Sequence, residues 1–171
     1  MTSEQRIIGL DPGLSGGWAL IDETGNLLRC GDFPTYPIIK NGKKTTQIDR
    51  PALANLLGAL NPTLAFIESV SSRPRQAGAF QFGFNTGLLY GILCAQGVTV
   101  IAVSPAVWKP FYGLQRQENQ TQRDTKNAAR AVAAELYPGS ARQFARVKDD
   151  GVAEAALIAL YGLNKKAESR V

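Results

Sequence analysis

Short hydrophobic runs separated by turn residues make up the first third of the chain. The run Arg-Ile-Ile-Gly-Leu-Asp at residues 6–11 predicts a buried strand that ends in an acid, and similar runs at 17–22 and 26–33 predict two more strands. The turn residues Glu-Thr-Gly-Asn between the last two runs indicate an antiparallel meander. Residues 34–48 contain two prolines, a glycine and three lysines. We expect them to form a long loop.

Helices and strands alternate along the rest of the chain. Two further strands are expected at residues 63–69 and 98–103. Helical patterns predict helices at about 50–60, 79–96, 105–111, 122–136 and 150–163. This order predicts an α/β fold of the RNase H-like type: a five-stranded mixed sheet, its first three strands antiparallel, flanked by helices. At this length, residues 1–171 are expected to form a single domain.

The amino-acid composition excludes several classes of catalytic and metal site. The chain has no histidine and two cysteines, which excludes Ser-His-Asp hydrolysis, four-ligand zinc sites and a disulfide framework. Catalysis would therefore depend on carboxylates, lysines, hydroxyls or a bound cofactor. No secretory signal or membrane-spanning run is visible, so no membrane partner is expected, and the expected location is the cytoplasm.

The charge balance points to a polyanionic partner. Lys and Arg number 19 against 14 Asp and Glu, which gives a net charge of +5 and a pI of about 9.4. A basic domain of this kind often binds nucleic acid, although a solubilising surface gives the same balance. If the acids gather in one metal-bearing cleft, the remaining surface is more basic still.

Four acids are expected at one edge of the predicted sheet. Asp11 ends the first strand, Glu68 ends the fourth, and Asp150 and Glu154 lie four residues apart at the start of the last helix. Strand ends and helix starts meet where α/β proteins usually bind ligands. Carboxylates without a basic partner repel one another unless hard cations lie between them, and Mg²⁺ prefers such oxygen ligands. Two such ions about 3.5–4 Å apart can promote phosphodiester cleavage.

The same acids also fit structural roles. Asp11 precedes Pro-Gly, which is typical of a turn, and Asp149 and Asp150 suit the N-terminus of a helix. Glu154 also fits a solvated position on its helix. Glu68 is harder to explain in this way, because a carboxylate that ends a buried strand needs a partner and none is adjacent in sequence.

Five motifs in order resemble those of the RuvC-type Holliday junction resolvases of the RNase H-like superfamily, especially its bacteriophage-type members. The motif I-I-G-L-D-P-G-L-S-G-G-W-A-L-I resembles the family's first strand and places Asp11 as a metal-binding acid. The motif L-A-F-I-E-S-V places Glu68 as another. S-P-A-V-W-K-P and R-D-T-K-N-A-A-R resemble the segments after the fifth strand. K-D-D-G-V-A-E-A-A-L-I-A-L resembles the last helix, where Glu154 matches the final acid and Asp149 or Asp150 the preceding one.

The resemblance implies a dimeric, structure-selective DNA endonuclease that acts on Holliday junctions or other branched DNA. It would depend on two Mg²⁺ ions per active site, for which Mn²⁺ is expected to substitute. The expected metal ligands are Asp11, Glu68, Asp149, Asp150 and Glu154. The expected catalytic residues are Asp11, Glu68, Asp150, Glu154, Lys109 and Lys126. The residues expected to contact DNA are Arg73, Arg75, Lys109, Arg123, Lys126, Arg146 and Lys148.

Two features of the middle of the chain leave alternatives open. Ser71 stands where many family members have an aromatic residue that wedges into the junction. Phe80, Phe82 and Phe84 offer stacking nearby, although alternating phenylalanines are more typical of a core. Glycines at 83, 87 and 91 would leave one face of the helix at 79–96 bare, for packing against the sheet or for a dimer interface. The resemblance favours the dimer, which would present two identical sites to a junction.

Other functions fit parts of the pattern. The acids alone do not separate a junction resolvase from an RNase H-like nuclease that cuts flaps, forks or RNA–DNA hybrids. The run D-P-G-L-S-G-G also resembles the phosphate-binding loop of the actin and sugar-kinase superfamily, but the chain is too short for that superfamily's second lobe. A non-catalytic DNA-binding module would have no use for four acids at one edge, because acids repel phosphate.

Overall fold

A mixed β-sheet forms the centre of the computed structural model, which describes residues 5–40, 42–69, 78–115, 117–118 and 120–168. The sheet has five strands in the order β3-β2-β1-β6-β7. Their bounds are β1 Arg6–Asp11, β2 Gly17–Asp22, β3 Leu27–Asp32, β6 Leu64–Glu68 and β7 Thr99–Val103. The first three strands are antiparallel, whereas β6 runs parallel to β1 and β7 parallel to β6. The predicted five-stranded mixed sheet is confirmed.

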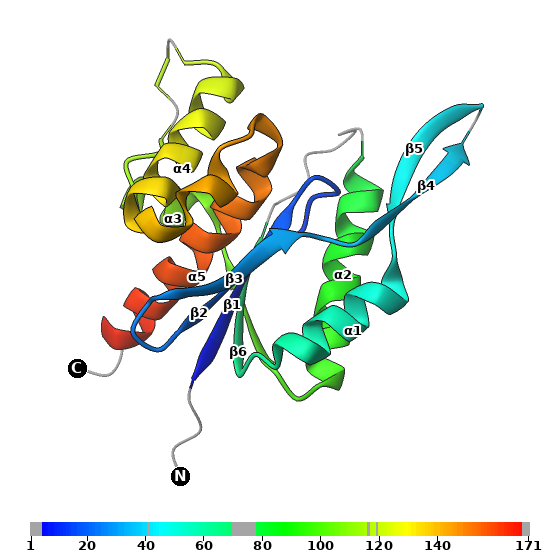
Figure 1. Ribbon diagram of the computed structural model, residues 1–171, viewed down its shortest axis with the longest axis horizontal. Coiled ribbons are helices and arrows are strands. Elements are labelled where there is room, and N and C mark those ends of the chain that lie inside the picture. The colour runs from blue at the N-terminus through cyan, green and yellow to red at the C-terminus, as the bar shows by residue number, and fades with distance from the viewer. Residues whose placement is uncertain (1–4, 41, 70–77, 116, 119, 169–171) are drawn as a thin grey trace.

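Helices cover both faces of this sheet (Figure 1). On one face lie α1, Arg50–Leu60, and α2, Ala79–Ala95. On the other lie α3, Pro105–Phe111, α4, Gln122–Leu136, and α5, Asp150–Glu168, with short 3₁₀ helices η1, Pro138–Phe144, and η2, Val147–Asp149, between the last two. No helix in the described part of the chain is long and apolar enough to cross a bilayer.

Strand alternation divides the hydrophobic residues between two cores. Ile7 and Phe66 belong to the cluster under α4 and α5, whereas Ile8, Leu10 and Ile67 belong to the cluster under α1 and α2. Side chains that alternate along a strand point to opposite faces, so a sheet covered on both sides needs such continuous apolar runs. The two cores therefore hold β1 and β6 rigidly at the centre of the molecule.

Helix α5 lies unusually close to the sheet. A Cβ atom on Gly9 would lie only 2.1 Å from the carbonyl oxygen of Ala155 and 2.6 Å from the amide nitrogen of Ala159. At the helix start, Gly151 forms a β-bridge with Gly16, in the loop after β1. Small residues on both sides thus allow the backbones to touch, and this contact sets where the first turns of α5 lie relative to the end of β1.

The prediction of a long loop at 34–48 is wrong. This segment forms a β-hairpin, β4 Thr35–Lys40 and β5 Lys43–Ile48, in a two-stranded sheet of its own that projects from the body (Figure 1). The β-branched residues Ile38, Ile39, Thr45 and Thr46 favour strands, and Gly42 has a φ of 73°, which a tight hairpin turn requires. The prolines and lysines misled the prediction, because both are tolerated in a sheet with two edges and no buried centre.

The contact between α5 and β1 is testable with one added methyl group. Gly9→Ala should lower the free energy of unfolding by about 3 kcal/mol, because the methyl group meets backbone atoms of α5. Gly91→Ala is the matched control: a Cβ there meets nothing within 4 Å, and alanine should raise helix stability by up to about 1 kcal/mol. Urea unfolding at low protein concentration measures both. Equal stability of the Gly9→Ala variant and the parent would refute the close contact.

Candidate active site

Four carboxylates from three elements meet at one edge of the sheet. Asp11 and Glu68 end the neighbouring parallel strands β1 and β6, and the register pairs the residues just before them, Leu10 with Ile67. Asp150 and Glu154 come from the first turns of α5. Their proximity is visible in their electrostatics, because Glu154 and Asp150 both raise the pKa of Asp11, and Asp11 and Glu154 raise the pKa of Glu68.

Burial and mutual repulsion disfavour negative charge at this edge. Burial, with the charge of Glu154 next in importance, raises the pKa of Asp11 from 3.8 to about 6. Burial, with the charges of Asp11 and Glu154, raises the pKa of Glu68 from 4.5 to about 7. Glu68 and Glu154 are only 6% and 8% exposed. A cation at this edge would therefore strongly stabilise the charged forms of Asp11 and Glu68, the two strand-end carboxylates.

Two lysines supply positive charge to the α5 acids. The Lys109 ammonium from α3 lies 3.1 Å from Oε1 of Glu154, and the Lys126 ammonium from α4 donates a hydrogen bond to Asp150. That hydrogen bond to Asp150, opposed in part by burial, raises the pKa of Lys126. Both lysines thus belong to the candidate site, and neither is a purely solvated side chain.

Trp108 is a residue of this site that the sequence analysis missed. Its indole Nε1 donates a 3.1 Å hydrogen bond to Oε1 of Glu68, and its side chain is fully buried. The hydrogen bond holds the Glu68 carboxylate in one orientation and opposes the rise in its pKa. The motif S-P-A-V-W-K-P contained the signal, because a buried tryptophan next to a site lysine needs an acceptor for its N–H.

The turn after β1 serves the site as well. The backbone N–H of Gly13 donates a 3.2 Å hydrogen bond to Oδ1 of Asp11, and this contact lowers the pKa of that carboxyl in part. Asp11 is therefore both a turn residue and a member of the acidic group.

The structure separates Asp149 from Asp150. Asp149 is 1% exposed and accepts hydrogen bonds from the backbone N–H and the guanidinium of Arg146. Burial raises the pKa of Asp149, but the bonds to Arg146 outweigh it and the net shift is downward. Its charge also acts on Cys30 of β3, away from the acidic group. The geometry therefore groups Asp150, and not Asp149, with Asp11, Glu68 and Glu154.

The residues expected to contact DNA lie in different surroundings. Arg123 is exposed at the start of α4. Arg146 pairs with Asp149, and Lys148 lies 3.7 Å from a carboxylate oxygen of Asp32, yet both side chains remain more than half exposed. Arg73 and Arg75, together with Ser71, lie outside the described residues.

The donor chemistry of the acidic group fits a hard divalent cation. All four side chains offer carboxylate oxygens, the ligands that Mg²⁺ prefers, and burial together with the charges of neighbouring acids raises the pKa of Asp11 and Glu68. Within the described part of the chain, no three of these side chains are arranged as a ready metal site. A cation would instead compete with Lys109 and Lys126 for Glu154 and Asp150.

Replacing Trp108 tests how Glu68 is held. Trp108→Phe removes the N–H donor but keeps an aromatic ring, so the pKa of Glu68 should rise further above 7 and the free energy of unfolding should fall by about 1–3 kcal/mol. Trp18→Phe is the matched control, because its Nε1 donates to the carbonyl oxygen of Asp32, remote from Glu68. ¹³C NMR titration of the glutamate carboxyls measures the pKa. An unchanged Glu68 titration in Trp108→Phe would contradict this account.

Comparisons with known proteins place this arrangement in a known fold. The sequence matches no family model and no curated protein. Among solved structures, it is similar to Thermus thermophilus RuvC in complex with a Holliday junction substrate, with a TM-score of 0.61 and 14% identity over 95% of this chain and 96% of that chain. The fowlpox virus resolvase bound to Holliday junction DNA gives a TM-score of 0.53 and 12% identity over 95% and 99% of the two chains. The yeast mitochondrial Holliday junction resolvase gives a TM-score of 0.51 and 14% identity over 97% of this chain and 80% of that chain. The chain therefore has the RNase H-like fold of the RuvC-type Holliday junction resolvases.

Proposed function

We propose that this protein is a divalent-metal-dependent endonuclease that cleaves phosphodiester bonds in Holliday junctions or other branched DNA. The observation that carries the proposal is the convergence of Asp11, Glu68, Asp150 and Glu154, from three elements far apart in sequence, on one buried edge where the pKa values of Asp11 and Glu68 are raised. A purely structural role does not explain why a stable fold would gather four acids there. The basic balance of the chain supports a phosphate-bearing substrate.

The same four carboxylates would hold two Mg²⁺ ions, Asp11 and Glu154 flanking one and Glu68 and Asp150 completing the pair. When bound, the ions would supply charge to stabilise the cleaved phosphate and would activate the attacking water. The chain itself orients the ligands: Trp108 holds Glu68 and the Gly13 N–H holds Asp11. Pre-oriented ligands of this kind reduce the reorganisation that metal binding requires.

Lys109 and Lys126 would act in two states of the site. Without metal and substrate, their ammonium groups balance the charges of Glu154 and Asp150. With a scissile phosphate in place, the same groups would stabilise the negative charge that develops on it. Both ammonium groups are only partly buried, so they remain accessible to a phosphate backbone.

The choice of branched DNA rests on the likeness in fold. Two structures of that fold hold Holliday junction DNA, and they match nearly the whole of this chain. For this chain we propose the same class of substrate, with DNA contacts from Arg123, Arg146 and Lys148. Arg73 and Arg75, which lie outside the described residues, are proposed as further contacts from the sequence alone. A bacteriophage origin and a cytoplasmic location remain expectations from the sequence.

A homodimer would bring two such sites to one junction, and α2 is its proposed interface. Gly83, Gly87 and Gly91 are exposed, and a Cβ at each would meet nothing within 4 Å. The glycines are therefore not required for packing against the sheet, which removes the alternative left open by the sequence. Each glycine lowers helix stability by up to about 1 kcal/mol, so close approach of a second copy would give them a role. We place this contact at Gly87 and Gly91, beyond the first turn of α2 that holds Phe80.

The nuclease proposal is tested with labelled four-way junction, flap, duplex and RNA–DNA hybrid substrates in Mg²⁺, Mn²⁺ and EDTA. The four-way junction should be cut in Mg²⁺ and left intact in EDTA. Asp11→Asn should slow cleavage by more than about 100-fold while DNA binding persists. Cleavage by the variant at the parental rate would refute the assigned site, and faster cutting of flaps or hybrids would refute the junction assignment.

Asp11→Asn should also raise the free energy of unfolding. A variant that lost activity because it misfolds would be less stable instead. The pKa of Asp11 is raised to about 6 in the folded state, so its charged form destabilises the folded protein. The resulting loss of stability grows as pH rises from about 4 to 6 and reaches its full size above pH 6. In EDTA at pH 8, removing the charge should therefore raise the free energy of unfolding by about 1–3 kcal/mol. Denaturant unfolding at pH 8 and pH 5 measures this, with a smaller difference expected at pH 5.

The dimer is tested by adding bulk to the bare face of α2. Analytical ultracentrifugation should show the parent as a dimer, and Gly87→Leu should weaken dimerisation by about 10-fold or more. Ala128→Leu, which adds the same exposed side chain to α4, is the matched control and should leave the dimer intact. A monomeric parent at tens of micromolar, or equal dimerisation of the two variants, would exclude α2 as the interface.

A further inference from the structure

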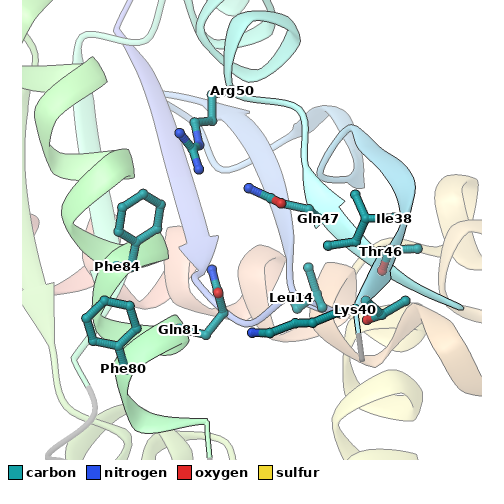
Figure 2. Close-up of a pocket in the computed structure, with 10 residues that line it drawn as sticks. Leu14, Ile38, Lys40, Thr46, Gln47, Arg50, Phe80, Gln81 and Phe84 are labelled. Carbon is teal, nitrogen blue, oxygen red and sulfur yellow. The ribbon is translucent and has the colours of Figure 1, made fainter. Parts of the chain in front are cut away.

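A cleft separates the β4–β5 hairpin from the start of α2. Its volume is ≈ 460 Å³, which lies in the range of small-ligand sites. Its wall includes Leu14, from the loop that follows Asp11, so the cleft begins a few residues from the acidic edge. Figure 2 shows side chains of the hairpin and of α2 facing this space from opposite sides. Neither the acidic group nor the two site lysines line it.

Two phenylalanines one helical turn apart form the α2 side of the cleft. Phe80 is 85% exposed and Phe84 is 41% exposed, so of the two alternatives that the sequence left open for them, a core position does not apply to either. The Arg50 guanidinium lies 5.1 Å from the centre of the Phe84 ring, which leaves the Phe80 ring as an open apolar face. An aromatic ring this exposed at the mouth of a cleft is suited to stacking against a flat partner.

Positive charge comes from the other side of the cleft. Lys40, at the end of β4, and Arg50, at the start of α1, both extend toward α2 (Figure 2). No carboxylate lines the cleft among the residues that the structure describes, whereas the amides of Gln47 and Gln81 do. The lining therefore combines cations, amides and an aromatic face, which complements a phosphate joined to a flat, hydrogen-bonding base.

One face of the β4–β5 hairpin lines the cleft, and the opposite face is exposed to solvent. On the face toward the cleft, Ile38, Thr45 and Gln47 are partly buried. On the opposite face, Ile39 is 76% exposed, and Lys44, its cross-strand partner, is also exposed. Alternation along the strands thus points Lys40 into the cleft and Lys44 away from it.

We propose that this cleft binds an unpaired nucleotide of DNA, with its base stacked on Phe80 and its phosphate held by Lys40 and Arg50. This inference rests on the proposed function, because it takes the same DNA as its ligand. Since Leu14 joins the cleft to the loop after Asp11, a strand that has left the duplex would be held beside the acidic edge. A branched substrate supplies such unstacked nucleotides, whereas a continuous duplex does not.

The probe is a short oligothymidylate carrying one 2-aminopurine, titrated in EDTA so that metal-dependent cleavage is excluded. Phe80→Ala should lower its affinity about 5- to 30-fold, because base stacking on an aromatic side chain is lost. Ile39→Ala, which removes another highly exposed apolar side chain from the far face of the hairpin, should leave the affinity unchanged. Circular dichroism checks that the variants fold.

The charge contribution has its own matched pair. Lys40→Gln should reduce the slope of log affinity against log salt by about 0.7, as expected for one lost contact to single-stranded phosphate. Lys44→Gln should leave the slope unchanged. If Phe80→Ala binds as tightly as Ile39→Ala, if the two lysine variants behave alike, or if the parent does not bind the oligonucleotide, the cleft proposal is overturned.

Junction cleavage by the same variants separates this proposal from the proposed function. A parent that cuts junctions, with no difference between Phe80→Ala and Ile39→Ala in oligonucleotide binding, would keep the nuclease and remove the nucleotide cleft. A parent that binds the oligonucleotide through Phe80 and Lys40 but cuts no DNA would keep the cleft and remove the nuclease.

Discussion

The close contact between α5 and β1 is the constraint on which the candidate site depends. Gly9 allows the backbone of α5 to lie against the strand, and Gly151 brings the helix start against the loop after β1. Asp150 and Glu154 sit on those first helical turns, so their distance from Asp11 follows from backbone contact and not from flexible side chains. A site built on a strand end and a packed helix is held more rigidly than one built on loops.

This rigidity has an energetic consequence for the acids. Carboxylates held close together in a buried edge can neither move apart nor gain water, so burial first and mutual repulsion second raise the pKa values of Asp11 and Glu68. The protein offsets part of this repulsion with Lys109, Lys126 and the N–H of Trp108. What remains uncompensated falls on Asp11 and Glu68 at the two strand ends, which form no direct ion pair with a lysine among the described residues. Under the proposed function, the site would trade stability for readiness to bind a cation, as catalytic sites commonly do.

Much of this arrangement could be predicted from the sequence because strand ends and helix starts are local signals. The hydrophobic runs identified all five strands of the main sheet, and their order placed Asp11 and Glu68 at one edge. The role of Trp108 could not be predicted in the same way, because its hydrogen bond joins residues 40 positions apart in sequence. Nor could spacing separate Asp149 from Asp150, since the separation depends on whether Arg146 or Lys126 reaches each carboxylate. The hairpin was missed because prolines and lysines, which interrupt a buried strand, are compatible with an exposed one.

The β4–β5 hairpin, which the sequence did not predict, affects how the acidic edge would meet the proposed DNA substrate. The edge itself carries carboxylates and would repel a phosphate backbone that lacked other contacts. Lys40 and Arg50 place positive charge on the far side of Leu14, while Lys109 and Lys126 place it within the edge. A strand held at the cleft would thus approach the acids with its charge already partly balanced. A phosphate backbone can be attracted by Lys40 and Arg50 and repelled by the carboxylates only if these two groups of charges are apart. The loop from Asp11 to Leu14 lies between them.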